Sequence, residues 1–63
     1  MTQKELLYVE DAICHEQTII KILENTAKEL KDEKLIKYVK NDIKNHQKME
    51  TKLTNLLEEL KNE

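Results

Sequence analysis

The stretch LKDEKLI, residues 30–36, decides the fold, because the spacing of apolar residues changes phase across it. On its N-terminal side, apolar residues recur at alternating steps of three and four, which places side chains on one side of an α-helix. Continued through the stretch, this spacing would need apolar residues where Lys34 and Lys37 stand. A new series begins at Ile36 instead, so the sequence predicts a turn at about residues 31–33.

Two series of eight residues, together called the seam, follow this spacing on either side of the turn. They are Leu6, Val9, Ile13, Glu16, Ile20, Leu23, Ala27 and Leu30, and then Ile36, Val39, Ile43, His46, Glu50, Leu53, Leu57 and Leu60. Asp32 followed by Glu33 is typical of a helix N-terminus, where unpaired amide groups favour a side-chain oxygen and a negative charge. We therefore expect an all-α fold: residues 1–63 form one antiparallel two-helix hairpin, with helices at about residues 3–30 and 33–61.

Composition supports helices and argues against several classes of function. Gly and Pro are absent, so the hairpin turns of a sheet protein have no suitable residues. Charged residues make up 38% of the chain with a net charge of -2, and the interleaved signs leave no basic face for nucleic acid. Ser is also absent and no Gly-rich loop occurs, so the sequence favours a role other than enzymatic catalysis.

Cysteine content and hydropathy predict a protein that stays in the compartment where it is made. The single cysteine, Cys14, has no partner within the chain, which fits a reducing compartment, and we expect it to pack beside the seam. The longest apolar run, residues 6–9, falls far short of the length that spans a bilayer, and the N-terminus has no signal-peptide core. We expect a cytoplasmic location with no membrane partner.

Both predicted helices carry an apolar flank on one side of the seam. The flank consists of Ala12, Ile19 and Thr26 on the first helix and Leu35, Asp42, Met49 and Leu56 on the second. A two-helix hairpin buries only a narrow strip, so this flank would be covered if two hairpins packed into a four-helix bundle. A core of this size also rarely supplies more than about 3–5 kcal/mol by itself. We therefore expect a homodimer, or alternatively a module whose apolar flank binds another protein.

Three ionisable residues, Glu16, His46 and Glu50, interrupt the middle of the seam. Pairing the helices outward from the turn places Glu16 opposite Glu50 and Ile20 opposite His46. One interpretation is structural, because ionisable groups on an inner face can bond to one another and fix the register of the helices. No Lys or Arg lies on the seam to neutralise two facing carboxylates, so this interpretation needs a proton or an imidazolium.

The other interpretation is a metal site. In a homodimer, Glu16, His46 and Glu50 would supply four carboxylates and two imidazoles, the ligands of carboxylate-bridged di-iron and di-manganese proteins. Asp42 lies one helical turn before His46 and would be a further ligand or an acceptor for the ring N–H. Oxygen and nitrogen ligands of this kind suit iron or manganese better than zinc. This interpretation predicts a metal-binding bundle with a redox role.

The chain resembles small ferritin-like helical hairpins and, more closely, short spore coat proteins of the coat protein F type in spore-forming Firmicutes. The resemblance is carried by residues 6–16, LLYVEDAICHE, by residues 32–37, DEKLIK, and by residues 45–47, NHQ. It implies a ferritin-like four-helix bundle and an assembly role in the spore coat, among other coat or assembly proteins. Ferritin-like sites use a Glu-x-x-His motif, and here Ile43 occupies the position of its Glu. The resemblance therefore favours packing over catalysis.

Overall fold

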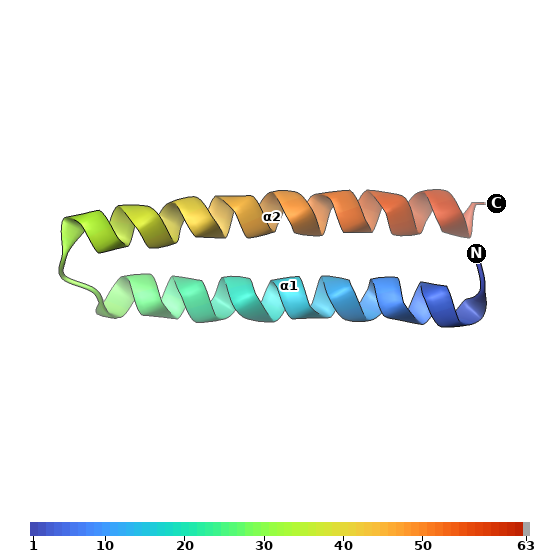
Figure 1. Cartoon of the computed structure of the whole chain (residues 1–63), viewed down its shortest axis with the longest axis horizontal. Helices are drawn as coiled ribbons and strands as arrows, with labels where there is room; N and C mark the ends of the chain where they lie inside the picture. The colour runs from blue at the N-terminus through green and yellow to red at the C-terminus, as the bar shows by residue number, and fades with distance from the viewer. Residues whose placement is uncertain (63) are drawn as a thin grey trace.

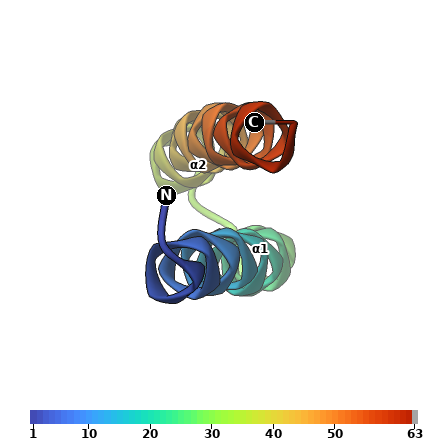
Figure 2. The same ribbon diagram turned by 90° about the vertical axis from the view of Figure 1, so that its right-hand side faces the viewer.

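The computed structural model describes residues 1–62, and over them the chain is an antiparallel pair of long helices. Helix α1 spans Gln3–Glu29 and helix α2 spans Glu33–Lys61 (Figure 1). The helices lie side by side along their length, with both termini at the end opposite the connection (Figures 1 and 2). The predicted helical hairpin is thereby confirmed. Helix α1 ends at Glu29 instead of residue 30, and the other helix ends are where the sequence placed them.

Both helices begin at a side-chain cap. Asp32 Oδ1 accepts hydrogen bonds from the N–H groups of Lys34 at 2.8 Å and Leu35 at 3.1 Å, as expected for the N-cap of α2. Thr2 and Glu5 form a capping box at α1, since each side chain accepts a hydrogen bond from the backbone N–H of the other, at 2.8 and 3.1 Å. The Thr-x-x-Glu spacing is the sequence signature of this box.

The chain reverses direction without a glycine. The connection, residues 30–32, has extended backbone at Leu30, with φ −80° and ψ 144°, and at Asp32, with φ −74° and ψ 121°. No residue from 1 to 62 has a positive φ, so no position in the turn requires the left-handed conformation. The phase change that the sequence shows across residues 30–36 is therefore achieved with ordinary backbone conformations.

The interior of the hairpin follows the predicted seam. All sixteen seam residues are at least partly buried. Even so, Ile20 at 9% exposure is the one buried hydrophobic side chain among residues 1–62, and α2 contributes none. The Cα atoms extend over 47 × 15 × 10 Å with a radius of gyration of 14.6 Å, against about 11 Å for a compact domain of this length. Two helices alone therefore leave the interior open at its sides.

Candidate functional site

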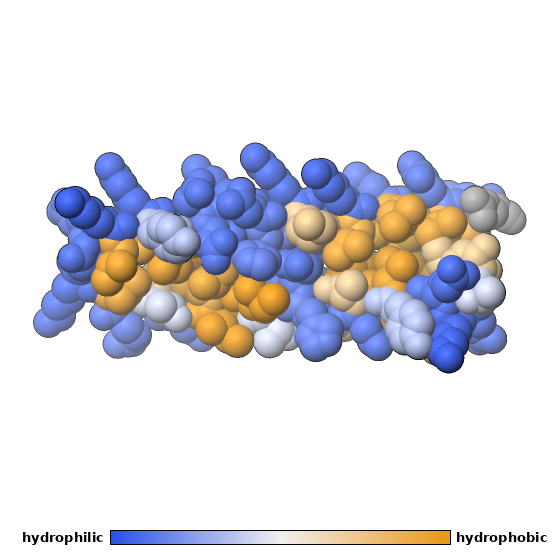
Figure 3. Space-filling view, in the orientation of Figure 1, coloured by the Kyte–Doolittle hydropathy of each residue, from blue (hydrophilic) through white to orange (hydrophobic). Residues whose placement is uncertain are grey.

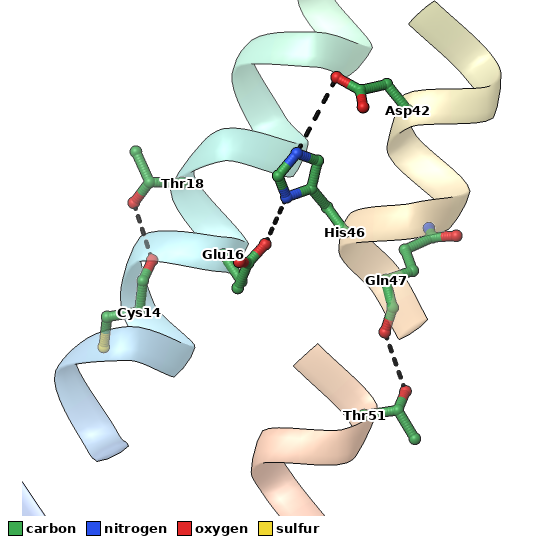
Figure 4. Close-up of polar contacts among 7 residues, drawn as sticks. All are labelled: Cys14, Glu16, Thr18, Asp42, His46, Gln47 and Thr51. Atoms are coloured by element: carbon green, nitrogen blue, oxygen red, sulfur yellow. Dashed lines mark hydrogen bonds and ion pairs between the residues drawn. The ribbon is translucent and has the colours of Figure 1, made fainter. Parts of the chain in front are cut away.

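Two of the three ionisable seam residues, Glu16 and His46, meet at the middle of the hairpin, and Asp42 lies on the other side of the His46 ring (Figure 4). His46 Nδ1 on α2 lies 2.6 Å from Glu16 Oε2 on α1. The other ring nitrogen, Nε2, lies 3.9 Å from Asp42 Oδ2, one helical turn earlier on α2. The imidazole therefore lies between two carboxylates, one from each helix.

The three side chains differ in exposure, from the interior outward. The exposed fraction of the side chain is 17% for Glu16, 29% for His46 and 45% for Asp42. An ionised carboxylate only accepts hydrogen bonds, so Nδ1 of His46 donates to Glu16. The distance from Nε2 to Asp42 exceeds hydrogen-bond length, so this contact becomes an ion pair only when the ring is protonated. The His46 ring therefore donates its Nδ1 proton to Glu16, and the Asp42 side of the ring is the side that water reaches.

The contacts differ from the pairing expected from the sequence. Glu16 was expected opposite Glu50, and Ile20 opposite His46, but Glu16 bonds to His46. Glu50 instead lines a shallow surface hollow with residues that include Ile20 and Gln17. His46 lies one helical turn before Glu50 on α2. The long side chain of Glu16, expected opposite Glu50, can therefore reach His46 in the next layer. Two carboxylates repel each other, whereas a carboxylate and an imidazole N–H attract, which explains why Glu16 turns toward the ring.

The predicted metal ligands are only partly brought together within one protomer. Glu16, His46 and Asp42 lie in one row, and no hydrogen bond or ion pair within residues 1–62 joins Glu50 to them. The same part of the chain contains no group of three or more His, Cys, Asp or Glu side chains arranged to hold a metal ion. In this part of one protomer, direct contact therefore brings together only two of the predicted ligands, Glu16 and His46. The predicted metal site therefore depends on a second copy of the chain and stays a prediction.

Cys14 was expected to pack beside the seam, but it is exposed. It lies one residue beyond Ile13, on the outer side of α1, where contact with a single partner helix does not reach. The expected surface residues Tyr8, His15 and Tyr38 are exposed. Cys14 is therefore an accessible thiol.

A second feature, which the sequence indicated only in part, is a hydrophobic surface on one side of the hairpin. With seam residues at positions a and d of a heptad, the flank described above occupies position g, and position c lies next to it. We call the apolar residues at these positions the c/g face: Tyr8, Ala12, Ile19 and Ile22 on α1 and Leu35, Tyr38, Met49 and Leu56 on α2. Because the helices are antiparallel, their g positions lie on the same side of the hairpin.

The exposed hydrophobic residues concentrate on this face. Among the large hydrophobic side chains exposed in residues 1–62, all lie at c or g positions except Leu7 and Met1, which precedes α1. Figure 3 shows one side of the hairpin, on which hydrophobic atoms gather in two areas along the junction of the helices, separated by hydrophilic atoms. The sequence indicated the g flank by its seven-residue spacing, but the contribution of position c went unrecognised, because Tyr8, Ile22 and Tyr38 follow no regular spacing.

Within residues 1–62, neither α1 nor α2 contains an apolar stretch long enough to cross a membrane. No family model, no curated protein and no solved structure matches the chain. The inference of function therefore starts from the hairpin, its polar centre and its hydrophobic face.

Proposed function

We propose that this chain is a small structural module of the assembly type, whose hairpins pair into a ferritin-like four-helix bundle. The observation that carries the proposal is the open interior of the hairpin, in which Ile20 is the one buried hydrophobic side chain among residues 1–62. A structural role of this kind needs a stable hairpin and a surface that a second hairpin can cover. A place in the spore coat is part of the proposal only through the sequence resemblance.

The accessible surface of the hairpin supports pairing. The chain exposes 5361 Å², whereas a compact monomer of 7.5 kDa exposes about 4,200 Å². The excess of roughly 1,100 Å² is larger than the ~800 Å² that each partner contributes to an interface of standard size. Docking of a second hairpin would bring the exposed surface per chain to that of an ordinary globular protein.

Thermal unfolding followed by circular dichroism over about a 100-fold range of protein concentration tests this function. In a dimer, unfolding is coupled to dissociation, so Tm is expected to rise with concentration. A Tm that stays constant over the whole range would contradict the proposal.

A second candidate function, metal binding, is favoured by one observation: a single imidazole contacts carboxylates from both helices. In a four-helix bundle, two such rows would lie in the same interior, together with Glu50 of each chain. The test is elemental analysis of protein purified without chelator and then incubated with iron or manganese. Metal retained by the unmodified chain and by His15→Ala, but lost in Glu16→Ala and His46→Ala, is the expected result. Equal metal content in all four proteins would rule this candidate out.

A further inference from the structure

We infer that the c/g face is the surface on which a second copy of this chain docks. The inference rests on the proposed function and makes it specific, because a four-helix bundle could also form through the opposite side of the hairpin. That opposite side consists of positions e and b, beyond the other edge of the seam. Two properties favour the c/g side, its charge and the sizes of its side chains, and its area is sufficient for a dimer.

Charge is low on the c/g side of the hairpin. From Tyr8 to Thr26, the c and g positions of α1 carry no Asp, Glu or Lys, although such residues make up 38% of the chain. The positions concerned hold Tyr8, Ala12, His15, Ile19, Ile22 and Thr26. On α2, the same positions from Leu35 to Glu59 carry three charges, at Asp42, Lys52 and Glu59. A nearly uncharged strip on α1 can be desolvated at little electrostatic penalty.

Charge is high on the opposite side. The e and b positions of α2 carry a series of lysines, Lys37, Lys40, Lys44 and Lys61. All four are exposed. A second copy docked there would have to desolvate these lysines together with charges of both signs on α1, such as Glu24 and Lys28, which disfavours that interface. The opposite side of the hairpin is therefore the side that faces water.

The sizes of the side chains on the c/g face favour the same chain as its occupant. Two of the three g positions of α1 hold small residues, Ala12 and Thr26, whereas three of the four g positions of α2 hold large ones, Leu35, Met49 and Leu56. A two-fold axis parallel to the helices places α1 of one copy over α2 of the other. Small side chains then face large ones, which is the condition for close packing between helical layers. The face is thus complementary to itself.

The area of the face is sufficient for a stable dimer. The Cα atoms of the whole hairpin extend over 47 × 15 Å, so each of its two sides has a footprint of roughly 700 Å², close to the ~800 Å² per partner of standard interfaces. Asp42 interrupts the apolar flank of α2 between Leu35 and Met49, and it already approaches the ring of its own His46. When the ring is protonated, the charge of Asp42 therefore has a partner while the face is covered.

A matched pair of leucines tests the assignment of the face. Leu35 at position g and Leu7 at position b are exposed to nearly the same extent, 52% and 55%, on opposite sides of the hairpin. Sedimentation equilibrium of Leu35→Glu is expected to show a dimer dissociation constant at least about tenfold above that of the unmodified chain. Leu7→Glu is expected to leave it unchanged. If Leu7→Glu weakens the dimer and Leu35→Glu does not, the face is wrong and the proposed function still stands. If the unmodified chain is a monomer at every concentration, both the docking face and the proposed function are wrong. The c/g face would then be a surface for a different protein.

Thiol reactivity gives a second readout that does not require a charged variant. The exposed Cys14 lies at position b, away from the c/g face, so its rate of reaction with a thiol reagent should stay constant as concentration rises. In Cys14→Ser combined with Met49→Cys, the rate should fall several-fold as the dimer forms. Equal rates for the two thiols at all concentrations would contradict docking through the c/g face.

Discussion

At the scale of single residues, His46 shows how a polar side chain occupies the interior of a narrow hairpin. A partly buried donor or acceptor needs a partner, and Glu16 supplies one from the other helix at 2.6 Å. Within residues 1–62, no buried side-chain nitrogen or oxygen lacks a hydrogen-bond partner. Glu16 and His46 therefore satisfy each other within one protomer, whereas, over the same residues, Glu50 forms no hydrogen bond with either of them.

The Glu16–His46 bond is expected to couple the two residues energetically. In a double-mutant cycle with Glu16→Ala and His46→Ala, the double variant should lose less stability than the sum of the single variants. The coupling energy should be about 0.5–1.5 kcal/mol, since both side chains are partly exposed. Denaturant unfolding measures it, and Lys48→Ala, at an exposed position on the outer side of α2, should change stability by less than about 0.5 kcal/mol. Strictly additive effects would mean that the bond contributes nothing.

Glu5 gives stability a dependence on pH in the acid range. The backbone N–H of Thr2, followed by its hydroxyl and the N-terminal charge, holds the pKa of the Glu5 carboxyl below its ordinary value. A lowered pKa stabilises the folded chain above the unfolded pKa of about 4.3, and this contribution is lost as pH falls through the lower, folded value. The stability of the unmodified chain relative to Glu5→Gln should therefore be largest near neutrality and shrink in acid. Thermal unfolding over this range measures the difference, and a difference that grows in acid would contradict the assignment.

The sequence predicted some of these residue contacts and could not predict others. The cap at Asp32 was predicted because it is local, and the capping box of Thr2 and Glu5, which was not predicted, is equally local, with the Thr-x-x-Glu spacing as its signal. The pairing of Glu16 with His46 is not local, because periodicity determines which side of a helix a residue faces but not which layer its side chain reaches. A long glutamate side chain can reach either of two neighbouring layers.

At the scale of helices, the spacing of apolar residues predicted the seam in full. Each of its residues is at least partly buried, including those on both sides of the polar centre. The turn was predictable without Gly or Pro, because a phase change between two heptad series leaves one continuous helix unable to bury both. The position of the turn then followed from the cap residue Asp32.

The Asp32 cap should be needed for the stability of α2. Asp32→Ala removes the oxygen that accepts from Lys34 and Leu35, which typically costs about 1 kcal/mol. For a chain of this length, that loss corresponds to a Tm lower by roughly 4–8 °C. Asp32→Asn retains the acceptor and should recover most of the loss. Equal Tm values for Asp32→Ala and the unmodified chain would show that the cap does not stabilise the hairpin.

At the scale of the whole molecule, the sequence predicted which side chains turn inward but not how deeply they are buried. Heptad spacing identifies the side of a helix that faces a neighbour, and it is the same whether two or four helices share the interior. For this reason Glu16 and His46 were expected in a dry interior and are instead partly open to water. A second hairpin packed against this one would bury these side chains further.

The dimer should become tighter when the apolar flank of α2 is made continuous. Asp42→Leu replaces the one charged residue between Leu35 and Met49 on that flank, and the dissociation constant should fall about tenfold. Asp11→Leu, on the outer side of α1, is the control and should leave the constant unchanged. Sedimentation equilibrium measures both variants. A weaker dimer for Asp42→Leu would mean that the carboxylate itself contributes to the interface.

The mass of the unmodified chain in solution tests the central claim, that two hairpins complete one bundle. Sedimentation equilibrium at micromolar concentration is the direct measurement. The predicted result is a species of twice 7.5 kDa that dissociates on dilution. A single species of 7.5 kDa at every concentration would contradict the claim.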